Sequence, residues 1–231
     1  MKNLLTIALL FNLLNTSFSN IQVDSFLKSV VNNGRVNYEL IQKEKTKQLD
    51  SLIQHINFTL VNSNTLKSKA AYLNLYNLLV IKQVVANYPI NSPNEIPGFF
   101  DKTKFTIKNK STTLNELENK IIRPAYNDPR IHFALVCGAK GCPPIHQFAF
   151  FTDSLDQQLK RITTFALNKQ DFIRFQKTGA AEISEIFKWY VADFGGNEKG
   201  IKNFINKYRG TNKVQSISYY TYNWALNDFK T

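Results

Sequence analysis

The sequence predicts one α+β domain that is mostly helical, with a small, mainly antiparallel sheet. Segments with apolar residues at helical spacing clearly outnumber segments that alternate between apolar and polar residues. The expected strands are not separated by regular crossover helices, as they would be in a parallel α/β sheet. Because no repeat, low-complexity tract or long linker divides the chain, we expect a single domain over residues 20–231.

The N-terminal 19 residues have the pattern of a secretory signal peptide. Lys2 precedes an apolar run over residues 4–14, and the small residues Ser17 and Ser19 suit the positions before a cleavage site. The run is well short of the roughly 20 residues that a spanning helix needs, and no cysteine follows it as in a lipoprotein. We therefore expect cleavage near Ser19, export to the periplasm or the medium, and no transmembrane segment in the mature chain.

The composition is that of a basic globular protein, with 43% hydrophobic residues and a formal charge of +12. This apolar content excludes a disordered chain. The basic residues are scattered rather than interleaved with aromatic ones, so we expect a solvated cationic surface and no nucleic-acid partner. In an exported protein, an anionic envelope component or a small ligand is the expected kind of partner.

The first half of the chain contains the strongest helix signal. Residues 21–31 have helical spacing and stop at Asn-Asn-Gly, and residues 39–60 form a more polar helix. Residues 70–85 are apolar nearly all round, which predicts a central buried helix. Asn74 and Asn77 lie three residues apart on one face of it, so each amide needs a partner: loop backbone, a polar side chain or a ligand.

The second half alternates short strands and helices. A hairpin is expected around residues 105–110, then a helix that begins with the capping box of Thr113 and Glu116 and ends at Pro124. The remaining elements are expected as a buried strand (131–137), a helix (154–168), a short strand leading into a capped turn at Ser184 (171–187), a short aromatic helix stopped by Gly195 (185–195), a helix (199–210) and a final strand (214–228).

Several stretches together resemble the domain of unknown function 547 family. They are GRVNYELI, AYLNLYNLLVIKQVVANYP, LNELENKIIRPAYNDPRIHFALVCGAKGCPPI, FTDSLDQQLKRITTFALN, EIFKWYVADFG and YNWALND, and they occur in the family's order over nearly all of residues 20–231. The resemblance implies an unassigned activity and, for bacterial members, export; the coiled-coil segment of plant relatives is lacking here. It also implies recurrent polar residues at Asn74, Asn77, Glu118, Arg123, Arg130, His132, Cys137 and Cys142.

The stretch RIHFALVCGAKGCPP concentrates the candidate chemistry. In a regular strand His132 and Cys137 point to opposite faces, whereas Cys142 could return to the face of His132. One hypothesis is a thiol hydrolase or acyl transferase, with a cysteine as nucleophile, His132 as base, and Asn74 or Asn77 orienting the imidazole.

A second hypothesis, which we favour, is structural: Cys137 and Cys142 form a disulfide in the oxidising compartment, and the protein binds a partner or has a structural role. A third is a metal site of His132, Cys137, Cys142 and His146, but the spacing is atypical of zinc, and we predict no metal and no cofactor. Redox exchange is also open, although four residues separate the cysteines instead of two.

Three charged residues near this stretch are candidate binding residues. Glu118 with Arg123 and Arg130 could form the ion-paired rim of a pocket, although an arginine more often braces a carboxylate inside the fold.

Overall fold

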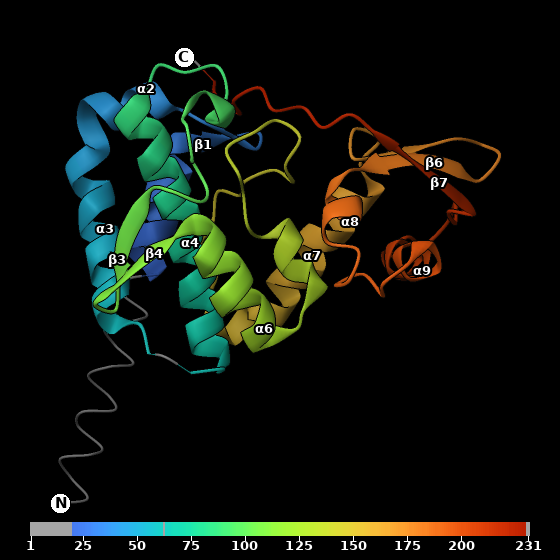
Figure 1. The fold of residues 1–231 in the computed structure, drawn as a ribbon, viewed down its shortest axis with the longest axis horizontal. Coiled ribbons are helices and arrows are strands. Elements are labelled where there is room, and N and C mark those ends of the chain that lie inside the picture. Colours follow the sequence, from blue (N-terminus) through green and yellow to red (C-terminus); the bar gives the residue numbers. More distant parts are fainter. Residues whose placement is uncertain (1–19, 62, 230–231) are drawn as a thin grey trace, which may run out of the picture.

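The computed structural model describes residues 20–61 and 63–229, which form a helical body with three small sheets (Figure 1). The predicted α+β class is confirmed. The principal helices are residues 20–30, α3 (Thr46–Thr59), α4 (Leu66–Asn87), α7 (Leu155–Asn168) and α9 (Glu198–Tyr208). The shorter helical elements are α2 (Tyr38–Leu40), η1 (Ile41–Lys45), η2 (Pro93–Glu95), α5 (Leu114–Glu116), η3 (Leu117–Ile122), α6 (Arg123–Tyr126), η4 (Pro129–Phe133), η5 (Thr152–Ser154) and α8 (Ile186–Trp189).

Seven short strands form three small sheets among the described residues. They are β1 (Val31–Asn32), β2 (Arg35–Val36), β3 (Lys104–Ile107), β4 (Lys110–Thr113), β5 (Ile173–Phe175), β6 (Ala180–Ser184) and β7 (Ser216–Tyr220). Three of the four strand pairings are antiparallel, and only β6 with β7 is parallel. The expected mainly antiparallel character is therefore correct.

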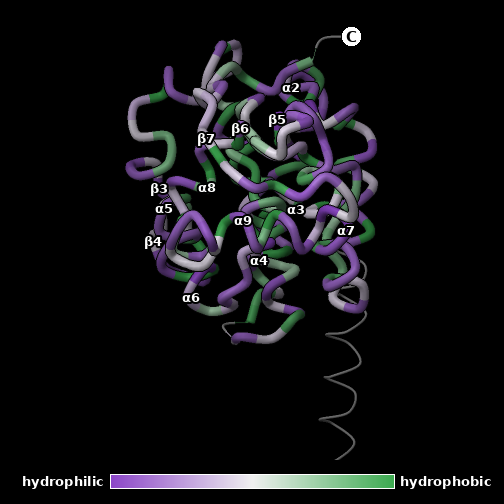
Figure 2. Tube along the Cα trace, turned by 90° about the vertical axis from the view of Figure 1, so that its right-hand side faces the viewer, coloured by the Kyte–Doolittle hydropathy of each residue, from purple (hydrophilic) through white to green (hydrophobic). Residues whose placement is uncertain are grey.

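Helix α4 is the centre of the core, as its sequence predicts. Between residues 70 and 85 nearly all of its apolar residues are buried, and so are Asn74 (2% exposed) and Asn77 (6% exposed). Hydrophobic residues lie mostly in the interior and hydrophilic residues along the outer loops (Figure 2). A buried amide is costly without a hydrogen-bond partner, so Asn74 and Asn77 fix the segments that pack on this part of the helix.

The helix after β4 differs from the prediction at its end. The capping box of Thr113 and Glu116 is present, but Pro124 does not end the helix. The chain continues from α5 through the π-helical η3 into α6 and stops at Asn127, which has a left-handed φ of 42°. A π turn shifts the local hydrogen-bond pattern, and helices use such turns to absorb a residue like proline.

The predicted strand over residues 131–137 is wrong. Asp128 accepts a hydrogen bond from the Arg130 amide (3.0 Å) and begins the 3₁₀ helix η4, after which the chain runs as a buried loop. An Asp-Pro pair favours such a turn, and a short apolar run alone does not distinguish a strand from another buried segment. The strand alternation that would place His132 and Cys137 on opposite faces therefore does not apply here.

The last segment crosses the molecule after β7. The predicted strand over residues 214–228 is limited to β7; beyond it the chain returns from the sheet to the helical body (Figure 1). There the amides of Leu226 and Asn227 donate to the carbonyls of Asn91 (2.7 Å) and Gly138 (2.8 Å). This return carries aromatic side chains to the loop that follows η4.

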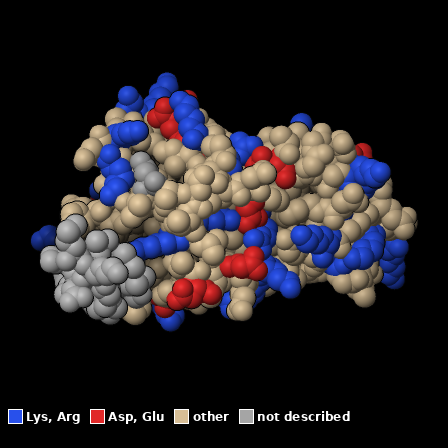
Figure 3. Space-filling view, turned by 90° about the horizontal axis from the view of Figure 1, so that it is seen from below, with Lys and Arg blue, Asp and Glu red and all other residues tan. Residues whose placement is uncertain are grey.

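The surface agrees with the scattered basic residues of the sequence. On the face in Figure 3, Lys and Arg side chains are scattered among uncharged residues, and fewer Asp and Glu side chains lie between them. Within residues 20–61 and 63–229, no helix is long and apolar enough to cross a bilayer.

Candidate functional site

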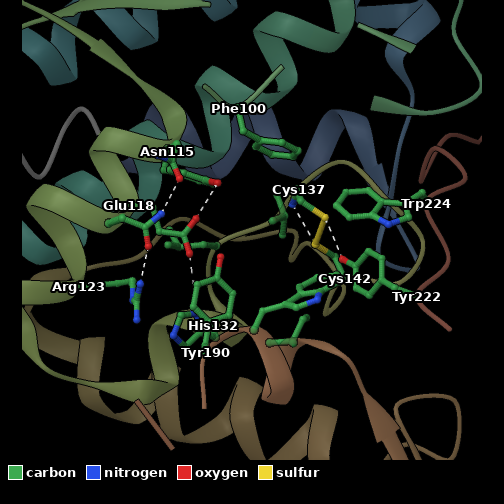
Figure 4. Close-up of a pocket in the computed structure, with 16 residues that line it drawn as sticks. Phe100, Asn115, Glu118, Arg123, His132, Cys137, Cys142, Tyr190, Tyr222 and Trp224 are labelled. Carbon is green, nitrogen blue, oxygen red and sulfur yellow. Dashed lines mark hydrogen bonds and ion pairs between the residues drawn. A yellow bond between two sulfur atoms is a disulfide. The ribbon is translucent and has the colours of Figure 1, made fainter. Parts of the chain in front are cut away.

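A pocket of about 440 Å³ opens where η3, the loop after η4, α8 and the C-terminal segment meet (Figure 4). Its lining divides into a polar end, formed chiefly from η3 and η4, and an aromatic end. The lining residues are Tyr76, Phe100, Asn115, Glu118, Asn119, Arg123, His132, Leu135, Val136, Cys137, Cys142, Ile186, Trp189, Tyr190, Tyr222 and Trp224.

His132 is held rigidly at the polar end. Its Nε2 lies 2.7 Å from Oδ2 of Asp193, and its Nδ1 lies 3.9 Å from Oε1 of Glu118. The ring stacks on Tyr190 with centroids 4.0 Å apart and an interplanar angle of 29°. Since both nitrogens face carboxylates and one ring face is covered, the imidazole has a single orientation.

Asp193 is fully engaged by two partners. Arg123 binds it in a bidentate manner, through Nε at 2.8 Å and Nη2 at 2.9 Å. The hydrogen bond with His132 and then those from Arg123 hold the pKa of Asp193 well below its usual range. Asp193 is therefore a carboxylate whose charge is already compensated within the protein.

Glu118 is the buried carboxylate of the polar end, with 8% exposure. The hydroxyl of Tyr76 donates to its Oε2 at 3.1 Å, and Tyr190 hydrogen-bonds it as well. Burial, followed by the charge of Glu118, raises the pKa of both tyrosines far above the usual value. Both hydroxyls thus stay protonated and act as donors at neutral pH.

The aromatic end consists of three mutually packed rings and Phe100. The rings of Trp189 and Trp224 are stacked, with centroids 5.9 Å apart and 26° between planes. Tyr222 contacts both, at 4.9 and 4.8 Å. Trp189 is 45% exposed, which places it at the mouth and leaves a flat apolar surface open to a ligand.

Cys137 and Cys142 form a disulfide in the pocket wall, as the favoured hypothesis expected. The hydroxyl of Tyr222 lies 3.0 Å from Sγ of Cys137, and the Cys137 amide donates to Sγ of Cys142 at 2.9 Å. Neither cysteine has a free thiol. The structure thus brings His132 and both cysteines to one pocket but offers no thiol nucleophile in this state.

Asn74 and Asn77 bind backbone instead of His132. Asn74 exchanges two hydrogen bonds with Phe150 (2.8 and 3.0 Å). Asn77 accepts from the Val136 amide (3.0 Å) and donates to the Ala134 carbonyl (2.9 Å). Both amides hold loops in place. The imidazole of His132 is oriented instead by Asp193, which contacts its Nε2.

Sequence reasoning missed Asp193 because its partners lie far away in the chain. The only local signal was a carboxylate just before the Phe194–Gly196 turn, and it named no partner.

The proposed rim of Glu118, Arg123 and Arg130 is only partly assembled. Glu118 and Arg123 line the pocket, but Arg130 lies apart from it, paired with Asp128 at 2.8 Å and with Asp156 at 2.8 Å. This pairing is the bracing role that arginines more often have.

His146 does not join the other metal-ligand candidates. It stacks on Phe148, with centroids 5.0 Å apart, and burial followed by the charge of Arg161 lowers its pKa to about 4. In the part of the chain that the structure describes, no three His, Cys, Asp or Glu side chains are placed to hold a metal ion.

Comparison with known proteins relates the middle of the chain to a protein family. Residues 60–165 match the family model described as "Protein of unknown function, DUF547". This range includes α4, η3, η4 and the disulfide loop; the stretches GRVNYELI, EIFKWYVADFG and YNWALND lie outside it. No curated protein and no solved structure matches.

Proposed function

We propose a function for this chain, which belongs through residues 60–165 to the DUF547 family of proteins of unknown function. In this proposal it is an exported protein that binds a small organic ligand. The ligand has a cationic or hydrogen-bond-donating head that meets Glu118 and a flat apolar body that stacks against Trp189 and Trp224. The observation that carries the proposal is the division of one pocket into these two ends.

The charges of the polar end favour a donor over an acceptor. Asp193 is ion-paired with Arg123 and hydrogen-bonded to His132. Glu118 is hydrogen-bonded by tyrosine hydroxyls and lies 3.9 Å from an imidazole nitrogen, and the charge of Arg123 also acts on it. A buried carboxylate gains most from a charged or strongly polar donor. The aromatic end supplies apolar area and a ring face.

Binding is favoured over thiol catalysis by the state of the cysteines. A Cys–His–Asn hydrolase or acyl transferase needs a thiolate beside the imidazole. Here both sulfur atoms are bonded to each other, and neither Asn74 nor Asn77 contacts His132. The alternative would require reduction of the disulfide and a different residue to orient the base.

Three ring compounds of equal size test the proposal: benzylammonium, benzyl alcohol and benzoate. Both tryptophans of the chain line the pocket, so intrinsic fluorescence reports occupancy. We expect saturable binding in the order benzylammonium, benzyl alcohol, benzoate. Glu118→Gln should weaken benzylammonium about tenfold, which corresponds to about 1.4 kcal/mol for one charge-assisted hydrogen bond.

A matched control is Glu116→Gln, two residues earlier, half-buried at its capping box and outside the pocket lining, which should leave the titration unchanged. Tightest binding of benzoate, or equal affinity of Glu118→Gln and wild type for benzylammonium, would contradict the assignment of Glu118 as the head-group partner.

Export is part of the proposal, and its signal lies in residues 1–19, outside the described residues. The described fold begins at residue 20, whose side-chain oxygen accepts a hydrogen bond from Asn74 (3.3 Å). Cleavage after Ser19 therefore leaves the packed helix over residues 20–30 whole. We expect N-terminal sequencing of the protein from its native host to begin at Asn20; an N-terminus within residues 1–15 in the cell extract, with none in the exported fraction, would refute export.

A further inference from the structure

The disulfide lies between two hollows of the protein surface. Cys137 and Cys142 are both only half-buried, and both line the aromatic pocket. Cys142 also lines a second hollow of about 430 Å³, which includes Gly141 and Asn223. Exposed disulfides are the ones that exchange with thiols, whereas disulfides buried in a core resist them.

We propose that this disulfide exchanges with a low-molecular-weight thiol that enters the pocket, and that the thiol attacks Sγ of Cys142 while Sγ of Cys137 leaves. The proposal goes beyond ligand binding at Glu118, because it requires only that the pocket admit a small thiol. We assign Cys142 as the attacked residue because it lines both hollows, whereas Cys137 lines only the aromatic pocket.

Tyr222 is placed to assist the leaving sulfur. A disulfide sulfur has no proton, so the Tyr222 hydroxyl is the donor in its 3.0 Å contact with Sγ of Cys137. Burial raises the pKa of Tyr222, so this hydroxyl keeps its proton at neutral pH. When the disulfide opens, the same hydroxyl donates to a thiolate, and a hydrogen bond to a charged acceptor is the stronger one.

The exchange is balanced without any further oxidant or reductant. The incoming thiolate forms a bond to Sγ of Cys142 as the Cys137–Cys142 bond breaks, and the electron pair stays on Sγ of Cys137. A second thiolate attacks the mixed disulfide and releases Cys142 as a thiolate. Two external thiols are thereby oxidised to a disulfide and the protein disulfide is reduced to two thiols; the reverse exchange with the external disulfide restores it.

The sequence argued against this role because thiol oxidoreductases commonly have two residues between their cysteines, and here there are four. The structure provides what spacing cannot show: both sulfurs in the wall of one pocket and a tyrosine hydroxyl on one of them.

The test is the rate at which 2-mercaptoethanol opens the disulfide of the mature, folded protein, followed by rapid alkylation and mass spectrometry. We expect a mixed disulfide on Cys142. Tyr222→Phe keeps the ring and removes only the hydroxyl, and should slow opening about tenfold. Tyr126→Phe is the matched control: its hydroxyl donates to the Ser63 carbonyl (3.2 Å) and it lines neither hollow, so the rate should not change.

Three results would overturn the proposal: a disulfide that opens only when the protein unfolds, a mixed disulfide found on Cys137, or equal rates for Tyr222→Phe and wild type. A circular dichroism melt of each variant verifies that it is folded. Because benzylammonium binding is measured separately, failure of exchange with intact binding refutes this proposal alone, and the converse refutes only the ligand assignment.

Discussion

Asp128→Asn is expected to lower the free energy of unfolding by about 3 kcal/mol at pH 7, because it breaks an ion pair that is largely buried. Asp128 accepts from Lys69 at 2.6 Å and from Arg130 at 2.8 Å, and the side chain of Lys69 is only 6% exposed. Asparagine keeps a side-chain oxygen that can cap η4. The loss in free energy of unfolding therefore measures the contribution of the negative charge of Asp128.

The pH dependence has a definite sign. Burial works to raise the pKa of Asp128, but hydrogen bonds from Arg130 and Lys69 outweigh it and lower the pKa from 3.8 to about 2. A depressed pKa gives stability that is present above pH 4 and lost as the pH falls toward 2, which amounts to roughly 2 kcal/mol for this shift. The difference between wild type and Asp128→Asn should therefore shrink over that range.

Urea denaturation followed by tryptophan fluorescence measures both values. The control is Asp156→Asn, which removes the other partner of Arg130; Asp156 is 76% exposed, so we expect a change below about 0.5 kcal/mol. Equal losses in the two variants, or a loss in Asp128→Asn that persists at pH 2, would contradict the role given to this carboxylate.

Asn77→Ala should destabilise the protein by about 3 kcal/mol and also weaken benzylammonium binding. It leaves the Ala134 carbonyl and the Val136 amide without their partner in a buried loop, and each such group costs about 1–3 kcal/mol. The same loop supplies Leu135 and Val136 to the pocket wall. A less ordered loop should therefore lower the affinity for benzylammonium.

Asn74→Ala is the matched comparison, because it removes the same kind of paired contact from Phe150, which does not line the pocket. We expect a similar loss of stability by urea denaturation but unchanged affinity in conditions where both variants are folded. If both variants bind like wild type, Asn77 does not shape the pocket.

Local signals in the sequence predicted much of the fold. The apolar run of α4, the capping box at Thr113, and the turn at Asn33–Gly34, where φ is 48° and 77°, each depend on neighbouring residues and were correct. Asn74 and Asn77 could be recognised as organisers because a buried amide on an apolar helix must find a partner.

The site depended on contacts between residues distant in the chain. Asp193 meets His132 across 61 positions, and Tyr222 meets Cys137 across 85. Neither the periodicity of apolar residues nor the spacing of motifs can predict contacts between residues so far apart in the chain. The mistaken strand over residues 131–137 had the same cause, since the Ala134 carbonyl and the Val136 amide bond the side chain of Asn77 instead of a neighbouring strand.

A crystal structure of the mature protein soaked with benzylammonium tests the central claim most directly. We predict the ammonium within hydrogen-bonding distance of Glu118 and the ring against Trp224, inside the pocket of Figure 4. An empty pocket at saturating benzylammonium, or the ammonium bound away from Glu118, would contradict the claim that this pocket is the binding site.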